Sequence, residues 1–296
     1  MAAKTSYKPK KFKLLHKAKV NRSHGGNFVV ILFITIFGLF MALPFIYAVG
    51  CAFKPLNELF LYPPLLWPQN PTFDNFIQLF SLMKNSWVPM SRYLFNTVFV
   101  TVLGTLGQII LASMCAFPLA KHPFPGNKFI FQTIFLSLMF HSSATAIPTY
   151  IIMAKLNMLN TYWALILPAC ASSFGLYLMR QFITQINNAL LEAAEIDGAN
   201  IWQTFWKIVM PMVKPAWLTL AVFSVQSLWN MGTSTYIFSE ELKTLTYAIS
   251  QVVAGGVART GAGMAVSVIM MIVPITVYIL TQSSVMQTMA SSGVKE

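Results

Sequence analysis

Long uncharged runs dominate the pattern of hydrophobic and polar positions along the chain. Six stretches of at least 24 residues contain no Asp, Glu, Lys or Arg, and every other uncharged gap is 15 residues or shorter. The six stretches are residues 23–53, 93–120, 129–154, 156–179, 215–239 and 260–294. A helix that crosses the hydrocarbon core needs about 20 apolar residues, so each stretch can hold one crossing. Because the runs lack the alternation of barrel strands, the pattern predicts six transmembrane helices.

The composition supports a membrane protein. Of the 296 residues, 56% are hydrophobic and 9% are charged, whereas soluble domains carry about a quarter charged residues. We therefore expect an all-α integral membrane protein. The net charge of +12 does not indicate a nucleic-acid binder, because such proteins display their charge on a soluble folded surface. Cys51, Cys115 and Cys170 have no metal-ligand spacing, so we expect no metal site.

The basic residues predict which side of the membrane holds the termini. Eight basic residues and no acidic residue precede the first stretch. Six crossings would place both termini on one side, which would then collect 14 basic residues against 6 on the other. Since cytoplasmic loops are enriched in Lys and Arg, we expect both termini in the cytoplasm. We interpret residues 1–27 as a basic arm that sets orientation and meets the lipid surface, with RNA binding as the alternative.

The sequence lacks the groups that would support enzymatic chemistry or proton transport. All eight acidic residues lie outside the six stretches, although proton-coupled carriers place carboxylates at membrane depth. The GxxxxGK[ST] phosphate-binding loop, the HExxH zinc motif and the GxSxG nucleophile motif do not occur. We therefore predict a transport subunit that is not an enzyme and has no ATP-binding site of its own.

A few polar residues lie inside the uncharged stretches. His141 is in the middle of the third stretch, and Gln226 and Asn230 share one helix face in the fifth at i and i+4. Polar groups within a bilayer usually face the interior of the helix bundle. Two interpretations stay open: the three side chains bond neighbouring helices, or they line the path of a polar solute.

Residues 180–214, between the fourth and fifth stretches, predict a helix–turn–helix outside the membrane. Asn187 or Asn188 can cap a short helix that Gly198 ends in the left-handed conformation. Asn200 and Gln203 can form a capping box at the start of a second helix. That helix is expected to carry an apolar stripe of Ile201, Phe205, Ile208 and Met212, widened by Trp202, Trp206 and Val209, before Pro211 and Pro215 disturb it. From the pattern alone, the segment could be an amphipathic hairpin that lies on lipid.

The same segment resembles the EAA motif of binding-protein-dependent ABC importer permeases. The matching residues are Glu192, Ala193, Ala194, Asp197, Gly198, Ala199, Phe205, Ile208, Pro211 and Pro215. The resemblance implies the type I importer permease fold, in which residues 186–215 form a coupling segment that docks on a separate ATPase. It also implies roles for three residues: Glu192 meets a basic group on the ATPase, Gly198 permits the turn, and Asp197 bonds nearby backbone.

Other segments resemble the carbohydrate permeases similar to the maltose-system subunit MalG. The matching segments are residues 53–55, 58–60, 63–64, 72–76, 96–97, 147–150, 159–162, 174–182, 229–230 and 293–295. The resemblance covers about residues 28–296, which we expect to form one permease domain. Residues 286–292 depart from the more basic sequence usual there, which puts a contact of the tail with the ATPase in doubt.

This resemblance implies a subunit of a carbohydrate importer in the bacterial plasma membrane, with oligosaccharides as the expected substrates. The implied partners are a second, different permease subunit, two ATP-binding subunits that hold ATP and Mg, and an extracytoplasmic solute-binding protein. The resemblance implies no nucleic-acid partner, and it implies no cofactor bound by this chain. On this interpretation His141, Gln226 and Asn230 are the candidates for the sugar path. Two alternatives stay open: an importer permease for another solute such as polyamine or phosphate, and a membrane scaffold without a transport role.

Overall fold

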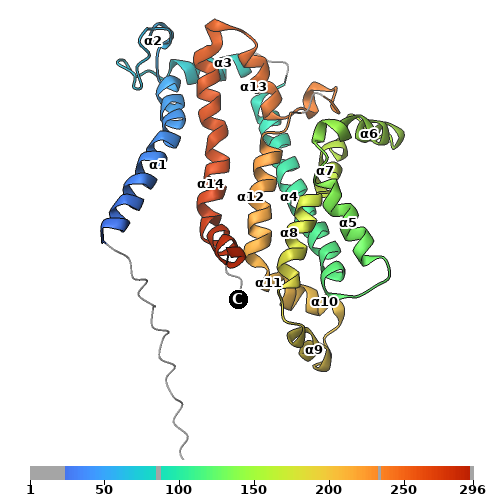
Figure 1. Ribbon diagram of the computed structural model, residues 1–296. Coiled ribbons are helices and arrows are strands. Elements are labelled where there is room, and N and C mark those ends of the chain that lie inside the picture. Colours follow the sequence, from blue (N-terminus) through green and yellow to red (C-terminus); the bar gives the residue numbers. More distant parts are fainter. Residues whose placement is uncertain (1–23, 85–87, 233–234, 294–296) are drawn as a thin grey trace, which may run out of the picture. The chain divides into compact units, whose positions relative to one another are not determined.

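The computed structural model describes residues 24–84, 88–232 and 235–293. The predicted basic arm, residues 1–27, therefore lies outside the described residues except for its last four, as do residues 294–296 at the C-terminus. Every regular element in the described part is a helix (Figure 1). The chain divides into two units, residues 1–47 and residues 48–296.

The first unit contains most of helix α1 (His24–Ala52). Its apolar side chains are exposed along almost its whole length, from Phe28 to Ile46. Twenty-nine residues of this composition are long enough to span the hydrocarbon core. Exposed apolar side chains all around a helix are typical of a surface that faces lipid.

Long helices side by side form the body of the second unit (Figure 1). Helix α4 (Met90–Lys121) packs against α7 (Trp163–Cys170), α8 (Ser173–Thr184) and α12 (Lys214–Trp229). Helix α12 packs in turn against α14 (Thr260–Gly293). Two shorter helices, α5 (Asn127–Ser137) and α6 (Ser142–Lys155), precede α7, and α5 contacts α8.

Short helices lie at the two ends of this bundle (Figure 1). At one end, which we call the hairpin end, are α9 (Asn188–Ile196), α10 (Ile201–Thr204), the π-helix η1 (Phe205–Val209) and α11 (Met210–Met212). At the other, the loop end, are α3 (Asp74–Lys84), the 3-10 helix η2 (Glu240–Leu242) and α13 (Leu245–Val253). The loop end also holds α2 (Leu56–Leu59) and the 3-10 helix η3 (Val257–Arg259).

A buried core joins the bundle to the hairpin end. Its centre consists of Phe117 of α4, Met179 and Ile183 of α8, and Phe205 and Val209 of η1. These side chains are at most 6% exposed. Burial of this kind contributes roughly 1.5–3 kcal/mol for each large apolar side chain. The hairpin is therefore packed onto the bundle through η1, and α9 extends beyond it.

The prediction of six transmembrane helices is not confirmed. Among the described residues, four helical segments are long and apolar enough to cross a membrane: Gly25–Ala52, Met90–Lys121, Trp163–Thr184 and Val257–Ser283. A fifth is possible if Ile201–Met212 and Lys214–Trp229, which meet at 76°, form one broken span.

The third uncharged stretch explains most of this difference. It is divided between α5 and α6, which have 11 and 14 residues and are separated by residues 138–141. His141 caps the second of these helices, so the chain ends one helix and starts another inside the run. The absence of charge predicted the apolar length of the stretch but not the continuity of its helix.

Candidate coupling site

Helix α9 has the cap structures that its sequence predicts. The Asn187 side chain accepts a hydrogen bond from the Ala189 N–H at 3.0 Å, which satisfies one free donor of the first turn. At the other end Gly198 adopts a left-handed φ of 81°. The Gly198 N–H donates to the Glu195 carbonyl and the Ala199 N–H to the Ala194 carbonyl. These two bonds form the Schellman motif, so local sequence alone determines where α9 ends.

The second helix begins as predicted but has a partly different buried face. Asn200 and Gln203 form the reciprocal capping box, with bonds of 2.8 and 3.0 Å. Phe205 is buried as expected, whereas Ile201 and Met212 are 55% and 50% exposed.

The predicted stripe is therefore confirmed only in part: Phe205 and Val209 are buried, Ile208 is half-buried, and the other members are exposed. Val213, outside the stripe, continues the buried face at intervals of four. The cause is the π-helical turn η1, in which the Met210 N–H reaches back five residues to the Phe205 carbonyl. A wider turn changes which side chains share a face. Pro211, which cannot donate to the residue four positions before it, follows this turn directly.

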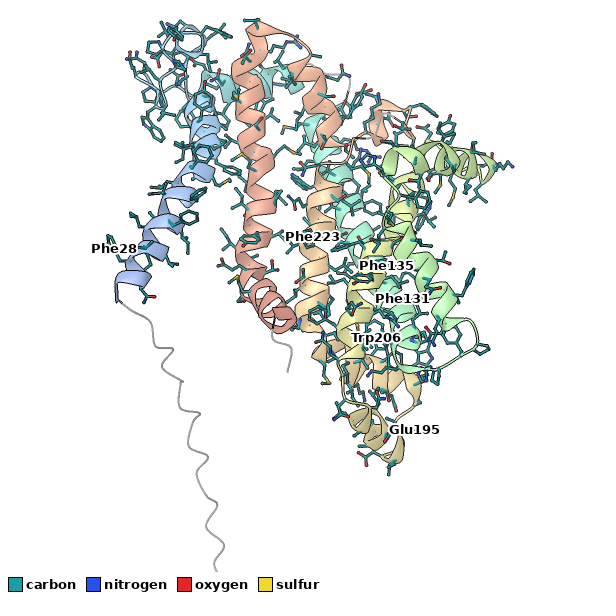
Figure 2. The ribbon with its side chains drawn as sticks, viewed as in Figure 1. Phe28, Phe131, Phe135, Glu195, Trp206 and Phe223 are labelled. Atoms are coloured by element: carbon teal, nitrogen blue, oxygen red, sulfur yellow. The ribbon has the colours of Figure 1, made fainter. Side chains whose placement is uncertain are left out.

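The motif residues divide into an exposed and a buried group. Exposed are Glu192, Ala193, Asp197, Gly198 and Pro211; Ala199 is half-buried; Ala194 and Phe205 are buried. Ile196, in the last turn of α9, is 86% exposed and follows the exposed Glu195, which Figure 2 shows on α9 beyond the bundle. A helix that presents carboxylates beside an exposed isoleucine offers both charge and apolar area to a protein partner.

One basic residue that sequence reasoning missed connects the hairpin to the bundle. Lys121, the last residue of α4, donates to the carbonyls of Thr184 and Ile186 and, at 2.9 Å, to the Asn188 side chain. Lysine often hydrogen-bonds the free carbonyls at the end of a helix, here α8. The sequence shows a charged residue at the end of the second uncharged stretch. It does not show which carbonyls that residue bonds.

Arg180 makes a similar connection within the bundle. It donates from Nε to the Leu119 carbonyl of α4 at 3.3 Å, and its guanidinium lies 3.6 Å from the centre of the Phe131 ring. A cleft of about 300 Å³ separates α9 and α10 from the end of α4, with Lys121, Glu192 and Glu195 among its lining residues.

An elbow joins the hairpin to the next long helix. Helix α11 ends at Met212 and α12 begins at Lys214, and the helical segments on the two sides meet at 76°. Val213, between them, is 2% exposed and belongs to the buried core. The Trp217 indole N–H donates to the Met210 carbonyl across the bend at 3.2 Å. The angle is therefore held by both packing and a hydrogen bond.

The three residues proposed for a solute path lie at helix ends or on exposed faces. His141 is exposed and caps α6 by accepting from the Ser143 N–H at 3.3 Å. Asn230 follows the last residue of α12 and donates to the Gln226 carbonyl at 2.8 Å. Both Gln226 and Asn230 are exposed. The bonds made by His141 and Asn230 are local, and their part in a solute path stays a prediction.

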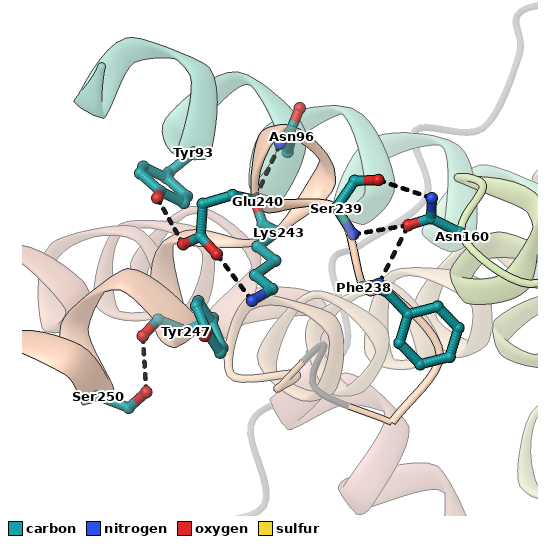
Figure 3. A network of polar contacts seen from close by, with 9 residues as sticks. All are labelled: Tyr93, Asn96, Asn160, Phe238, Ser239, Glu240, Lys243, Tyr247 and Ser250. Carbon is teal, nitrogen blue, oxygen red and sulfur yellow. Dashed lines mark hydrogen bonds and ion pairs between the residues drawn. The ribbon is translucent and has the colours of Figure 1, made fainter. Parts of the chain in front are cut away.

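The loop end contains a polar network that the sequence did not predict (Figure 3). Glu240 accepts from the Tyr93 hydroxyl at 2.8 Å and pairs with Lys243 at 2.7 Å. Burial raises the pKa of Glu240, but hydrogen bonds from Lys243 and Tyr93 outweigh this and hold the pKa below its ordinary value. For Lys243, burial lowers the pKa, but the bond to Glu240 outweighs it and raises the pKa. Asn96 donates to the carbonyls of Glu241 and Lys243 at 2.8 Å each.

Asn160 fixes the same loop from the other side (Figure 3). Its side-chain oxygen accepts from the N–H groups of Phe238 and Ser239 at 3.0 and 2.8 Å, and its amide donates to the Ser239 hydroxyl at 2.7 Å. Its φ is 59°, a left-handed value that asparagine tolerates better than most residues. The partners are 78 and 79 positions away, so no local signal identifies them.

Comparison with known proteins extends over most of the chain. Residues 26–289 match the family described as binding-protein-dependent transport system inner membrane component. Protein LplC of Bacillus subtilis (strain 168) is 34% identical over 200 residues, which cover 68% of this chain and 65% of that protein. The polygalacturonan/rhamnogalacturonan transport system permease protein YtcP of the same strain is 31% identical over 206 residues, 70% of each chain.

A further relative and a solved structure extend the comparison. The sn-glycerol-3-phosphate transport system permease protein UgpE of Yersinia enterocolitica is 30% identical over 231 residues, which cover 76% of this chain and 82% of that protein. One chain of a bacterial ABC transporter involved in the import of the acidic polysaccharide alginate has the same fold. It aligns with a TM-score of 0.75 and 22% identity over 88% of this chain and 98% of that chain. The chain is thus an all-helical, multi-pass membrane protein that belongs to the family of binding-protein-dependent transport system inner membrane components.

Proposed function

We propose that this chain is one permease subunit of an ATP-driven importer of oligosaccharides, without enzymatic activity of its own. The observation that carries the proposal is the exposed hairpin, whose capped α9 presents the EAA motif beyond the end of the bundle. An exposed, locally determined motif at the end of a membrane bundle is suited to contact another protein. The transport functions named for relatives such as YtcP support a carbohydrate as the solute.

The hairpin is the proposed contact with one of the two ATP-binding subunits, which would hold ATP and Mg. Glu192 is placed to meet a basic group of the ATPase, because its carboxylate is exposed and lines the cleft beside α4. Gly198 allows the chain to turn away from that contact, and Asp197 caps α9 through its own N–H, which donates to the Ala193 carbonyl at 2.9 Å. Movement of the hairpin would reach α4 through Lys121.

The remaining partners and the orientation follow from the family and the charge pattern. A second, different permease subunit would complete the path, and an extracytoplasmic solute-binding protein would deliver the sugar. A solved alginate transporter is in complex with a periplasmic protein bound to alginate pentasaccharide. The excess of basic residues supports cytoplasmic termini in a bacterial plasma membrane, with the hairpin end on the cytoplasmic side.

A second candidate is an importer permease for a phosphate-bearing solute. The similarity to UgpE, which is named as a permease for sn-glycerol-3-phosphate, favours this candidate. Recognition of a phosphate is usually achieved by arginine, lysine or helix N-termini.

Reconstitution of the whole importer in liposomes separates the candidates. The measurement is ATP hydrolysis in the presence of the solute-binding protein and a panel of oligosaccharides, monosaccharides and glycerol 3-phosphate. We expect one oligosaccharide class to stimulate hydrolysis. Stimulation by glycerol 3-phosphate alone would favour the second candidate, and purification of the chain without any associated ATPase would contradict both.

A further inference from the structure

A cavity of about 530 Å³, open on one side, lies between α4, the junction of α7 and α8, and α12. Its lining includes Gln108, near the middle of the 32-residue α4, and Phe223 of α12. Figure 2 shows Phe223 about halfway along the bundle. Small-molecule sites usually have volumes of roughly 300–1,000 Å³, so this cavity is large enough for a sugar ring.

The cavity wall includes a break in a membrane-spanning segment. Helix α7 ends at Cys170 and α8 starts at Ser173, so Ala171 and Ser172 interrupt the Trp163–Thr184 segment. Both interrupting residues line the cavity, and the Ser172 side chain caps α8 by accepting from the Gly175 N–H at 3.1 Å. Many transporters bind their solutes where helices are interrupted near the middle of the membrane.

Two buried polar side chains line the cavity from the neighbouring helices. Ser224 is 4% exposed, and its hydroxyl has no hydrogen-bond partner within the part of the chain that the structure describes. Gln108 is 7% exposed. A Cβ at Gly175 would lie 3.2 Å from the Gln108 Nε2, so the glycine leaves room for this amide. An unpaired buried hydroxyl costs roughly 1–3 kcal/mol. Less than 1 Å² of the Ser224 hydroxyl oxygen is accessible, so this group makes the wall polar but is not itself a contact for a ligand.

Two aromatic rings are part of the apolar lining, together with smaller aliphatic residues. Phe174 and Phe223 have ring centroids 5.5 Å apart in an edge-to-face arrangement of 85°. They are 42% and 48% exposed, so a large part of each ring is uncovered. A pyranose ring has hydroxyl groups around its edge and C–H groups on its faces. An uncovered aromatic surface beside hydrogen-bonding side chains matches both parts of such a ring.

We propose that this cavity is a binding subsite for one sugar residue of the transported oligosaccharide. The rings of Phe174 and Phe223 contact the C–H face, and Gln108 hydrogen-bonds a hydroxyl. The charge of the lining fits this ligand class, because no Lys, Arg, Asp or Glu is among the described lining residues. This inference rests on the proposed function. It gives this chain its own contact with the solute, at residues other than His141, Gln226 and Asn230.

Cysteine protection in the assembled importer tests the subsite. Ser227→Cys places a thiol in the cavity lining, and Ser267→Cys places one on an exposed position of α14 outside that lining. Each complex is treated with N-ethylmaleimide, with and without the stimulating oligosaccharide, after ATP and vanadate have trapped the transporter. Mass spectrometry of the peptide that carries each engineered cysteine measures labelling, so Cys51, Cys115 and Cys170 can stay in place. We expect the oligosaccharide to slow labelling at position 227 at least fivefold and to leave position 267 unchanged.

A second readout uses transport per ATP. Phe223→Ala and Gln108→Leu should lower the amount of sugar imported per ATP hydrolysed at least threefold. Phe135→Ala, which removes a half-exposed ring from α5, is the matched control and should keep the wild-type ratio.

The outcomes separate this inference from the proposed function. Equal labelling of position 227 with and without the sugar, in a complex whose ATPase responds to that sugar, would overturn the subsite and leave the importer function intact. A thiol at position 227 that never reacts would also overturn it, because another subunit would then cover the cavity. An ATPase that responds to no carbohydrate would overturn the proposed function itself.

Discussion

The two ends of the bundle use polar side chains in opposite ways. At the hairpin end, side chains such as Asn187 and Asn200 cap their own helices, and the motif residues Glu192 and Asp197 are left exposed. At the loop end, Asn96 and Asn160 bond backbone groups that are distant in sequence. In the first arrangement the helix ends are already capped, so the exposed motif side chains are free to contact a partner. In the second arrangement the side chains hydrogen-bond the backbone of a loop and fix its shape.

This difference teaches where a substitution should affect assembly and where it should affect stability. Exposed hairpin residues contribute little to the fold, so their replacement should leave the folded permease intact and weaken its contact with the ATPase. Buried residues of the loop-end network should show the reverse. Four substitutions or conditions test this contrast, from the largest expected effect to the smallest.

Gly198→Trp should have the largest effect. The left-handed φ of 81° is strained for any residue with a side chain, although no atom lies within 4 Å of an added Cβ. Strain together with a bulky ring on the docking surface should cost about 3 kcal/mol of ATPase binding, roughly a hundredfold. Co-purification of the ATPase and stimulated hydrolysis measure the effect. Gly198→Asn, which tolerates this backbone, is the control and should keep most of the binding; equal loss in both variants would contradict the role of the turn.

Glu192→Ala should have the next largest effect. Loss of one charge-assisted hydrogen bond to the ATPase should weaken binding by about 2 kcal/mol, roughly thirtyfold, and leave expression and membrane insertion unchanged. The matched control is Glu195→Ala, an exposed carboxylate of the same helix outside the motif. Wild-type ATPase binding and hydrolysis in the Glu192 variant would remove this residue from the coupling site.

Asn160→Ala tests the loop end. It removes the acceptor for two N–H groups and places alanine at a left-handed φ. We expect the permease to lose about 2 kcal/mol of stability, while ATPase binding by the folded fraction does not change. Thermal unfolding in detergent measures the loss. Asn160→Gly keeps the backbone conformation without the acceptor and should be destabilised less. A normal unfolding temperature in both variants would show that the bonds from Asn160 to residues 238 and 239 do not stabilise the permease.

The Glu240–Lys243 pair should have the smallest effect. Because the pKa of Glu240 is held below its ordinary value of 4.5, the pair stabilises the fold fully above pH 4.5 and loses this contribution as the pH falls further. The Glu240 side chain is 37% exposed, so solvent screening keeps the contribution below about 1 kcal/mol. Wild type and Glu240→Gln should therefore differ slightly in unfolding temperature at pH 7 and converge near pH 3. A difference that grows on acidification would contradict the assigned pKa direction.

Local features of the hairpin could be predicted because their physics is local. A cap needs an asparagine and a nearby N–H, and a left-handed turn needs a glycine, so Asn187, Gly198 and Asn200 were identified from sequence alone. The apolar stripe was predicted only in part, because it assumed a regular α-helix. With the π-turn before Pro211, Phe205 and Val209 are buried but Ile201 and Met212 are exposed.

Features that depend on distant parts of the chain were missed. Lys121 could be read as the end of an uncharged stretch, but its bonds to residues 184–188 depend on how α8 packs against α4. The polar lining around Ser224 and Gln108 depends on three helices meeting at one height. The count of six spans is not confirmed because the sequence marks the ends of uncharged runs but not a helix break inside one. The break near His141 carries no charge.

The braced elbow between α11 and α12 would transmit a movement of the hairpin to α12 as a rigid lever. One arm carries the hairpin, and the other is α12, whose Phe223 and Ser224 line the cavity between α4 and α12. Because the Trp217–Met210 bond and the buried Val213 hold the angle, a push on the short arm is not absorbed at the corner. It turns the long arm instead. A sideways stroke at the hairpin would in this way change the width of a chamber several helical turns away.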